Sequence, residues 1–252
     1  MAKQSFKFTN AAGRRLSGVL EAGKQPMSWA VFAHCFTCDK SSLAATHVSR
    51  ALAATGIGVL RFDFTGLGES GGQFGDGLSS DIQDVVSAAE AMHERGMTPQ
   101  LLVGHSFGGA AVLAAVSKLP TIKAVAVIGA PFSADHILVH LKPGLGEVPS
   151  GERLPVTIGG RVFELGADFV QDVCGQDQAA RIAGLDRALL VLHSPVDDVV
   201  SINNAAGIFE AAQHPKSFIS LDNADHLLTD RADSVYAAKV ISAWVGRYID
   251  RP

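Results

Sequence analysis

The sequence has no long apolar run and little cysteine. Its longest apolar stretches, such as residues 124–130, are far shorter than the roughly 20 residues that a membrane helix needs. The first ten residues, MAKQSFKFTN, have no apolar core and no small-residue cleavage site, so we expect neither a secretory signal nor a membrane contact. Three cysteines, Cys35, Cys38 and Cys174, cannot all pair with one another, and so low a number is more typical of a reducing compartment. We therefore expect a cytoplasmic protein.

Basic runs are also missing. No Lys/Arg run is longer than the pair Arg14-Arg15, and the formal net charge is −4, which argues against a nucleic acid as partner. The 252 residues are 47% hydrophobic and 18% charged, which excludes a disordered chain and is enough for one large core. The sequence leaves the oligomeric state open, a homodimer included.

Strands and helices alternate along most of the chain. This order is typical of a mostly parallel sheet with helices on both faces. Apolar patterns predict eight strands, at residues 6–9, 16–21, 29–36, 57–64, 100–104, 124–129, 187–193 and 216–221. Helices are predicted at 42–54, 80–95, 107–119, 202–212 and 234–248.

One segment interrupts the alternation. Residues 131–185 are rich in glycine and proline and contain one predicted hairpin, 155–165, that turns at Gly159-Gly160. Such a stretch is too long for a simple connection in a compact domain, which favours a functional insertion. We therefore expect a core made of residues 1–130 and 186–252, with 131–185 as a small cap or lid over the carboxyl edge of the sheet.

The segment LLVGHSFGG, residues 101–109, carries the most specific pattern. An apolar strand runs into Gly104-His105-Ser106-Phe107-Gly108, and a helix of small residues follows. A serine in a tight strand-to-helix turn projects its hydroxyl above the sheet, and the flanking glycines remove side chains that would clash there. The pattern predicts Ser106 as a catalytic nucleophile.

An acid and a base follow in the order that this serine chemistry uses. His226 lies in DNADHLL after the last predicted strand, and it is the histidine best placed to accept the serine proton. Asp197 and Asp198 both follow the strand at 187–193, and position alone favours Asp197 only about two to one. His34 and His105 lie in the two loops nearest Ser106, where we expect them to line the substrate site.

The loop after the third strand, HCFTC at residues 34–38, should supply an oxyanion donor. We expect the backbone N–H groups of Phe36 and Phe107 to form the oxyanion hole. A Cys35-x-x-Cys38 pair also suggests a redox or zinc site, but only the lone Cys174 and scattered histidines remain as further ligands. We favour small residues that pack the loop, and we expect no metal and no cofactor.

A glycine-rich loop at residues 66–77 suggests a phosphate cradle. It lacks the GK[ST] ending, and no G-x-G-x-x-G opens a helix directly, so a nucleotide site is not expected. We predict that Arg61 and Asp63 brace this loop through hydrogen bonds and a salt bridge.

Several motifs together resemble a known family: AHCFTC, RFDFTGLGES, GHSFGGAAVLAA, LHSPVDDVV, HPKSF and DNADHLL. They resemble the hydrolase portion of bacterial proteins in which an α/β hydrolase is fused to an OsmC-type peroxidase, over nearly the whole chain. The chain is also similar to feruloyl-esterase and monoacylglycerol-lipase-like serine hydrolases. The resemblance implies an α/β-hydrolase fold with a mostly parallel eight-stranded sheet. It implies Ser106 as nucleophile, His226 as base, Asp197 as acid, and Phe36 and Phe107 as oxyanion donors.

The expected function is therefore carboxylesterase-like cleavage of a small acyl ester through an acyl-enzyme on Ser106. Apolar residues of the insertion, among them Phe132, Phe163 and Phe169, suggest a hydrophobic acyl site, although the packing of the insertion itself explains them equally well. A thioesterase, an aminopeptidase-type acyl hydrolase and a ligand-binding protein without activity are the alternatives.

Overall fold

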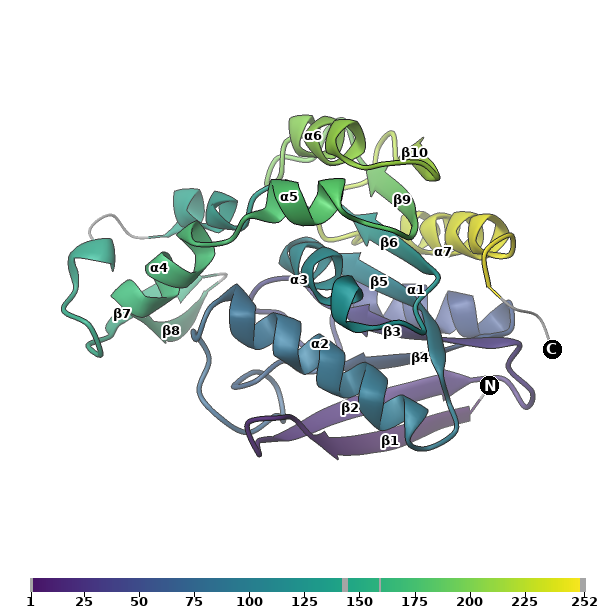
Figure 1. Ribbon diagram of the computed structural model, residues 1–252, viewed down its shortest axis with the longest axis horizontal. Helices are drawn as coiled ribbons and strands as arrows, with labels where there is room; N and C mark the ends of the chain where they lie inside the picture. The colour runs from purple at the N-terminus through teal and green to yellow at the C-terminus, as the bar shows by residue number, and fades with distance from the viewer. Residues whose placement is uncertain (1, 142–144, 159, 250–252) are drawn as a thin grey trace.

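A computed structural model describes residues 2–141, 145–158 and 160–249, and it contains an eight-stranded sheet (Figure 1). The strand order is β1-β2-β4-β3-β5-β6-β9-β10, and among these described strands β2 alone runs opposite to the other seven. The strands are β1 (Ala2–Thr9), β2 (Arg15–Ala22), β3 (Ser28–Ala33), β4 (Ile57–Phe62), β5 (Pro99–His105), β6 (Ala124–Ile128), β9 (Ala188–His193) and β10 (Lys216–Ser220). The predicted mostly parallel sheet of eight strands is confirmed.

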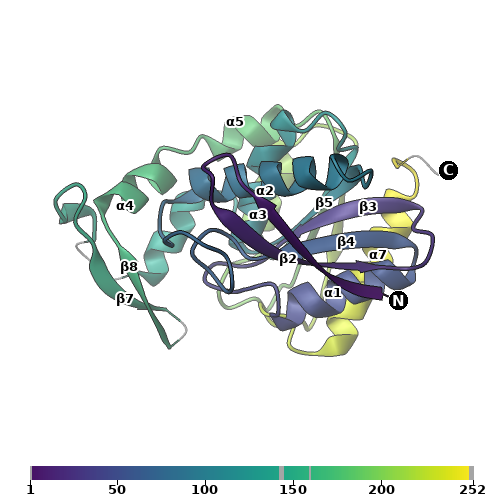
Figure 2. The same cartoon turned by 90° about the horizontal axis from the view of Figure 1, so that it is seen from below.

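Two apolar cores lie on opposite faces of this sheet. Along β3, Val31 faces one core while Ala30 and Phe32 face the other, because successive side chains of a strand point to opposite sides. Helices α1 (Leu43–Ala54) and α7 (Arg231–Val245) cover one face, whereas α2 (Leu78–His93) and α3 (Phe107–Ala115) cover the other (Figure 2). Both faces of the central strands are therefore shielded from water, which explains their continuous apolar runs.

The helices agree with the predicted ones in type, and their ends differ by a few residues. The prediction placed the start of the last helix at Ser234, but α7 begins at Arg231 because Asp230 accepts a hydrogen bond from the Ala232 N–H at 2.8 Å. Helix α6 (Asn203–Ala211) lies within the predicted range 202–212. Among the described residues, no helix is long and apolar enough to cross a membrane.

Residues 131–185 contain more regular structure than the sequence predicted. The predicted hairpin is present as β7 (Leu154–Ile158) and antiparallel β8 (Arg161–Leu165), while residue 159 of its turn lies outside the described residues. Helices α4 (Ala167–Cys174) and α5 (Gln178–Ala183) and two short 3-10 segments, Ala134–His140 and Leu145–Glu147, were not predicted. Figure 1 places β7, β8 and α4 beyond the end of the sheet, and α5 over α3.

Candidate active site

Ser106 lies in a strained turn between β5 and α3. Its φ angle of 54° is unusual for a residue with a side chain, and it turns the hydroxyl out of the sheet. The glycines of the motif are needed on steric grounds. A Cβ at Gly104 would lie 2.5 Å from the Gly108 carbonyl oxygen, and a Cβ at Gly108 would press on the backbone oxygen of His34. The G-x-S-x-G pattern is therefore a packing requirement of the turn.

The chain brings Ser106, His226 and Asp197 together from three separate connections. The Nε2 atom of His226 lies 2.9 Å from the Ser106 hydroxyl, and its Nδ1 atom lies 2.8 Å from Asp197 Oδ2. With Nδ1–H donating to the carboxylate, Nε2 is free to accept the serine proton. Ser106 and His226 are both buried, at 8% and 7% exposure, so little water competes for these hydrogen bonds.

The Asp197 side chain is held from two sides. Oδ1 accepts hydrogen bonds from the N–H groups of Val199 and Val200 at 3.0 and 2.8 Å, while Oδ2 faces His226. Burial would raise the pKa of the Asp197 carboxyl, but these hydrogen bonds and the one with His226 outweigh it and lower the pKa. Its neighbour Asp198 is exposed. Of the two carboxylates left open by position, only Asp197 contacts the imidazole.

His34 and His105 are buried beside this hydrogen-bonded chain and contact protein atoms. His105 Nε2 lies 2.7 Å from the carbonyl oxygen of His226, behind the imidazole. His34 Nδ1 lies 2.8 Å from the Cys35 carbonyl, and its Nε2 accepts the N–H of Phe64 at 3.4 Å. The structure thus gives both rings a bracing role, and a contact with substrate stays a prediction.

Burial of His105 should make the protein less stable in acid. Burial, with the nearby His226, lowers the pKa of His105 to about 4, whereas an unfolded histidine titrates near 6.5. Between these two values the unfolded chain binds the extra proton, so the free energy of unfolding falls as the pH falls from 6.5 to 4. For His105 alone the loss is about 3 kcal/mol. Burial also lowers the pKa of His34 and His193, which adds to the same trend.

Urea unfolding at pH values from 7 to 4.5 measures this effect. The variant His105→Gln keeps a neutral hydrogen-bond donor, and its stability should fall less steeply with acid than that of the parent. A parent and a variant with parallel pH curves would show that His105 does not carry this dependence.

The loop after β3 carries a disulfide. Cys35 and Cys38 are bonded across a turn that the Cys38 N–H to Cys35 carbonyl hydrogen bond also closes, at 3.1 Å. The favoured prediction, two unpaired small residues that pack the loop, is wrong on this point. The spacing of three residues contained the signal, and a turn that brings the Cα atoms within 5.3 Å makes the bond feasible. Cys174 is exposed and free.

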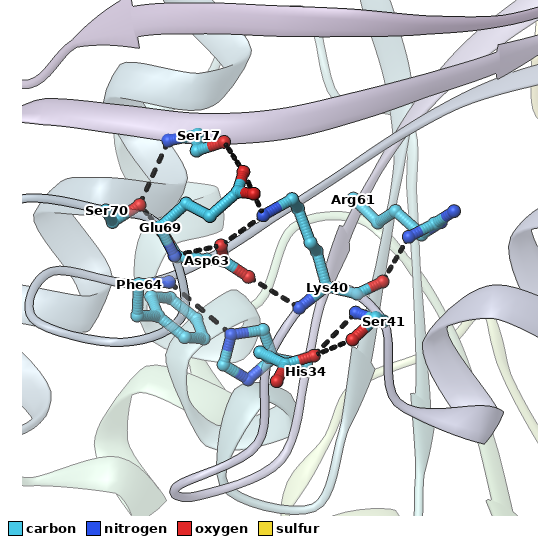
Figure 3. Close-up of polar contacts among 10 residues, drawn as sticks. Ser17, His34, Lys40, Ser41, Arg61, Asp63, Phe64, Glu69 and Ser70 are labelled. Atoms are coloured by element: carbon cyan, nitrogen blue, oxygen red, sulfur yellow. Dashed lines mark hydrogen bonds and ion pairs between the residues drawn. The ribbon is translucent and has the colours of Figure 1, made fainter.

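A buried ionic network holds the far end of the same loop (Figure 3). The Asp63 carboxylate accepts the Lys40 backbone N–H at 2.6 Å and pairs with the Lys40 ammonium at 2.5 Å. Burial would lower the pKa of Lys40, but hydrogen bonds to Asp63 and Glu69 outweigh it and raise the pKa. Arg61 donates to the Lys40 carbonyl and pairs with Glu21 at 2.9 Å.

This network also reaches the glycine-rich loop. Asp63 accepts the Glu69 N–H at 2.9 Å, and its carbonyl accepts the Ser70 hydroxyl at 2.6 Å. The predicted bracing of this loop is present for Asp63, whereas Arg61 contacts Glu21 and the Lys40 carbonyl and not residues 66–77. Lys40, which pairs with Asp63 and with Glu69 of the loop, is a further member that the sequence analysis missed. Lys40 lies 23 residues from Asp63, so no local pattern connects the two.

Comparisons with known proteins place the chain in a family. An esterase domain of a Rhodothermus marinus protein is 41% identical, with a TM-score of 0.83 over 99% of this chain and 100% of that one. The chain belongs to the α/β-hydrolase superfamily. A family model described as serine aminopeptidase, S33, matches residues 30–146 of this α/β hydrolase. No match is found among curated protein sequences.

More distant structures share the fold of this α/β hydrolase. Est1E from Butyrivibrio proteoclasticus with bound ferulic acid is 18% identical, with a TM-score of 0.83 over 96% of this chain and 98% of that chain. A dienelactone hydrolase from Anabaena variabilis is 17% identical, with a TM-score of 0.71 over 99% of this chain and 100% of that chain.

Aromatic rings from the core and from residues 131–185 of the α/β hydrolase meet next to Ser106. The Phe36 ring packs on Phe107 and Phe169, with ring centroids 5.2 and 5.8 Å apart, and Phe74 contacts Phe163 at 4.9 Å. A cavity of about 10 Å³ lies between Phe36, Phe107 and Phe169. It has room for about one water molecule.

Phe132, the third apolar residue predicted to contact substrate, packs against α6, and its contact with substrate stays a prediction. Its N–H donates to Asn204 at 3.0 Å, and its ring packs where a Cβ at Gly207 of α6 would be. The largest cavity described, about 430 Å³, lies between α1 and α7 and is lined by none of the residues of the Ser106 site.

Proposed function

We propose that the protein is a serine carboxylesterase that cleaves a small acyl ester through an acyl-enzyme on Ser106. The observation that carries this proposal is the hydrogen-bonded chain from Asp197 through His226 to Ser106, with links of 2.8 and 2.9 Å. A hydroxyl, an imidazole and a carboxylate in this order are the groups that general-base activation of a serine requires. The 41% identical esterase domain supports ester substrates.

In the proposed reaction, the Ser106 oxygen attacks the acyl carbonyl while His226 Nε2 takes the hydroxyl proton. The Asp197 carboxylate stabilises the imidazolium that forms and keeps its ring in place. His226 then gives the proton to the alcohol oxygen as the ester bond breaks. A water molecule, deprotonated by the same imidazole, releases the acid from Ser106.

The N–H groups of Phe36 and Phe107 would bind the oxyanion. Phe107 is the first residue of α3, so its N–H has no partner inside the helix, and the positive end of the helix dipole faces the same point. No described residue accepts a hydrogen bond from the N–H of Phe36. Each such donor contributes about 3 kcal/mol to transition-state stabilisation in comparable hydrolases.

We also propose that residues 131–185 form a cap that closes the acyl site, with Phe163 and Phe169 as its contribution. Arg153, in this segment, donates to the Phe74 carbonyl at 2.7 Å and pairs with Asp76 at 2.9 Å, which ties it to the glycine-rich loop. Because the rings of Phe36, Phe107 and Phe169 pack on one another and leave a cavity of about one water molecule, we propose that an acyl group bound between them is short.

A panel of esters tests this proposal. We expect kcat/KM to be highest for p-nitrophenyl acetate or butyrate and at least about tenfold lower for the octanoate, since a long chain has no room beside Phe169. A feruloyl ester belongs in the panel because Est1E binds ferulic acid. Preference for the feruloyl or octanoyl ester would contradict the proposed short acyl site, and no turnover of any ester would contradict the esterase.

The match to the serine aminopeptidase family favours one second candidate, cleavage of an aminoacyl amide. The same Ser106 chemistry serves esters, thioesters and amides, and the leaving group decides which reacts. Comparing kcat/KM for matched ester, thioester and aminoacyl p-nitroanilide substrates separates them. We expect the ester to be preferred.

A further inference from the structure

We infer that Cys35 and Cys38 form a reversible redox site that positions the Phe36 oxyanion donor, so that a dithiol reductant slows the enzyme. This inference rests on the proposed esterase function. Its basis is the place of the disulfide: the two cysteines enclose Phe36 and Thr37, in the loop that leads from β3 to α1.

The two ends of this loop are fixed without the disulfide. At the first end, the His34 ring binds the Cys35 carbonyl and the Phe64 N–H. At the other end, Asp63 holds both the backbone and the ammonium of Lys40 (Figure 3). Opening the disulfide therefore leaves the loop attached at both ends, and the change is confined to the residues between them.

The middle of the loop depends much more on the disulfide. Besides that bond, its backbone is held by the Cys38 N–H to Cys35 carbonyl hydrogen bond and by Arg161 of β8, which donates to the Thr37 carbonyl at 3.0 Å. Arg161 is exposed, so water competes for its contact. The Phe36 ring is anchored on Phe107, but the direction of its N–H follows the backbone of the turn.

The backbone strain at Thr37 favours a change in the turn when the disulfide opens. Its φ angle is 58°, a conformation that a β-branched residue adopts only when its surroundings force it. The disulfide keeps the ends of this turn together. Without it, Thr37 can return to a negative φ, and the Cys38 N–H then leaves the Cys35 carbonyl. The planar peptide group that carries this carbonyl and the Phe36 N–H keeps only its contact with the His34 ring, so it can tilt and turn the N–H away from the oxyanion.

The two sulfur atoms differ in access, which defines the chemistry. Cys35 is buried, with 5% exposure, whereas Cys38 is partly exposed. A thiolate of the dithiol attacks Cys38 Sγ, the disulfide breaks, and Cys35 leaves as a thiolate. The second thiol then attacks the mixed disulfide and releases the Cys38 thiolate. The dithiol becomes a disulfide and gives two electrons and two protons, and an exogenous disulfide reverses the reaction.

Kinetics of the two redox forms test this site. We would use the variant Cys174→Ser, which removes the exposed free thiol, and prepare one sample with dithiothreitol and one with its cyclic disulfide. Both are desalted, because free thiols cleave p-nitrophenyl esters themselves, and oxygen is excluded so that the reduced sample stays reduced. Iodoacetamide labelling and mass spectrometry then count the free thiols, and p-nitrophenyl acetate hydrolysis gives kcat and KM.

The reduced form should lose about tenfold or more in kcat, part of the 10²–10³-fold effect of a whole oxyanion donor. Its KM should change less than about twofold, because the donor acts on the transition state. Reoxidation should restore the rate. The double variant Cys35→Ser, Cys38→Ser in the same background should have the rate of the reduced form and ignore dithiothreitol.

Three results would overturn the inference. In the first, the two forms have the same kcat although the reduced form has two free thiols and the oxidised form has none. In the second, the disulfide does not form at any ratio of dithiothreitol to its cyclic disulfide. In the third, the serine double variant still responds to dithiothreitol. If the double variant does not fold, the comparison of the reduced and oxidised forms of the Cys174→Ser protein is enough to test the inference. If neither form hydrolyses the ester, the esterase proposal is wrong and this inference fails with it. If both forms hydrolyse it equally, the esterase proposal stands and only this inference is wrong.

Discussion

Ser106→Ala should lower kcat for p-nitrophenyl acetate by about 10⁶-fold, to a residual rate about 10³–10⁴-fold above the uncatalysed reaction. The hydroxyl oxygen is the only non-hydrogen atom removed, and it is the atom that would form the acyl-enzyme bond. The backbone at Ser106 stays in its turn, because Gly104 and Gly108 and not the hydroxyl create the space for it. Stopped-flow and steady-state assays on the purified variant measure the loss, and circular dichroism checks the fold.

Ser117→Ala is the matched control. Ser117 is exposed in the 3-10 turn that follows α3, at the opposite end of the helix from Ser106. This variant should keep its kcat within about twofold of the parent. Turnover of the Ser106→Ala variant at the parent rate would contradict the mechanism.

Asp197→Asn should lower kcat by about 10⁴-fold with little change in KM. The asparagine amide can donate to His226 Nδ1, and that contact favours the tautomer in which Nε2 carries the proton. An imidazole in that tautomer cannot accept the Ser106 proton. The carboxylate charge that stabilises the imidazolium is also lost. Kinetics over the pH range 6–9 measure the effect.

Asp198→Asn is a closely matched control, because Asp198 is the next residue and is exposed. We expect its kcat within about twofold of the parent, as for most surface substitutions away from the site. A larger loss in Asp198→Asn than in Asp197→Asn would transfer the role of the acid to Asp198.

The sequence predicted the core of the fold because its constraints are local. The run IGVLRF of β4 is buried on both faces, and its continuous apolar character indicates a central parallel strand without any other information. The turn at Ser106 could also be predicted from the sequence, since only glycine fits at positions 104 and 108. Position left Asp197 and Asp198 open, and a contact with His226, 29 residues away, separates them.

Residues 131–185 could not be derived in the same way. Helix α5 is short, and it is held by a buried hydrogen bond from the Gln178 amide to the Ala110 carbonyl, 68 residues distant. A helix of this length is marginal without such tertiary contacts. A local signal was nevertheless present, because Asp177 caps α5 by accepting the Ala180 N–H at 3.0 Å.

The contacts of His34 and His105 could not be predicted from the sequence either, because their partners are distant along the chain. Their positions near Ser106 suggested contact with substrate, but position along the chain does not say which way a ring points. His105 faces the backbone of His226, 121 residues away, and His34 faces Phe64 on the next strand's loop. The folded structure shows which protein atoms each ring contacts, and a contact of either ring with substrate stays a prediction.

Labelling with a fluorophosphonate tests the central claim most directly, namely that Ser106 is a nucleophile activated by His226. The reagent reacts with a serine whose hydroxyl a neighbouring base deprotonates, and a binding protein without activity should not react. We predict one adduct per chain, located by peptide mass spectrometry on Ser106 and absent from His226→Ala. An unmodified parent protein, or an adduct on any other residue, would contradict the account.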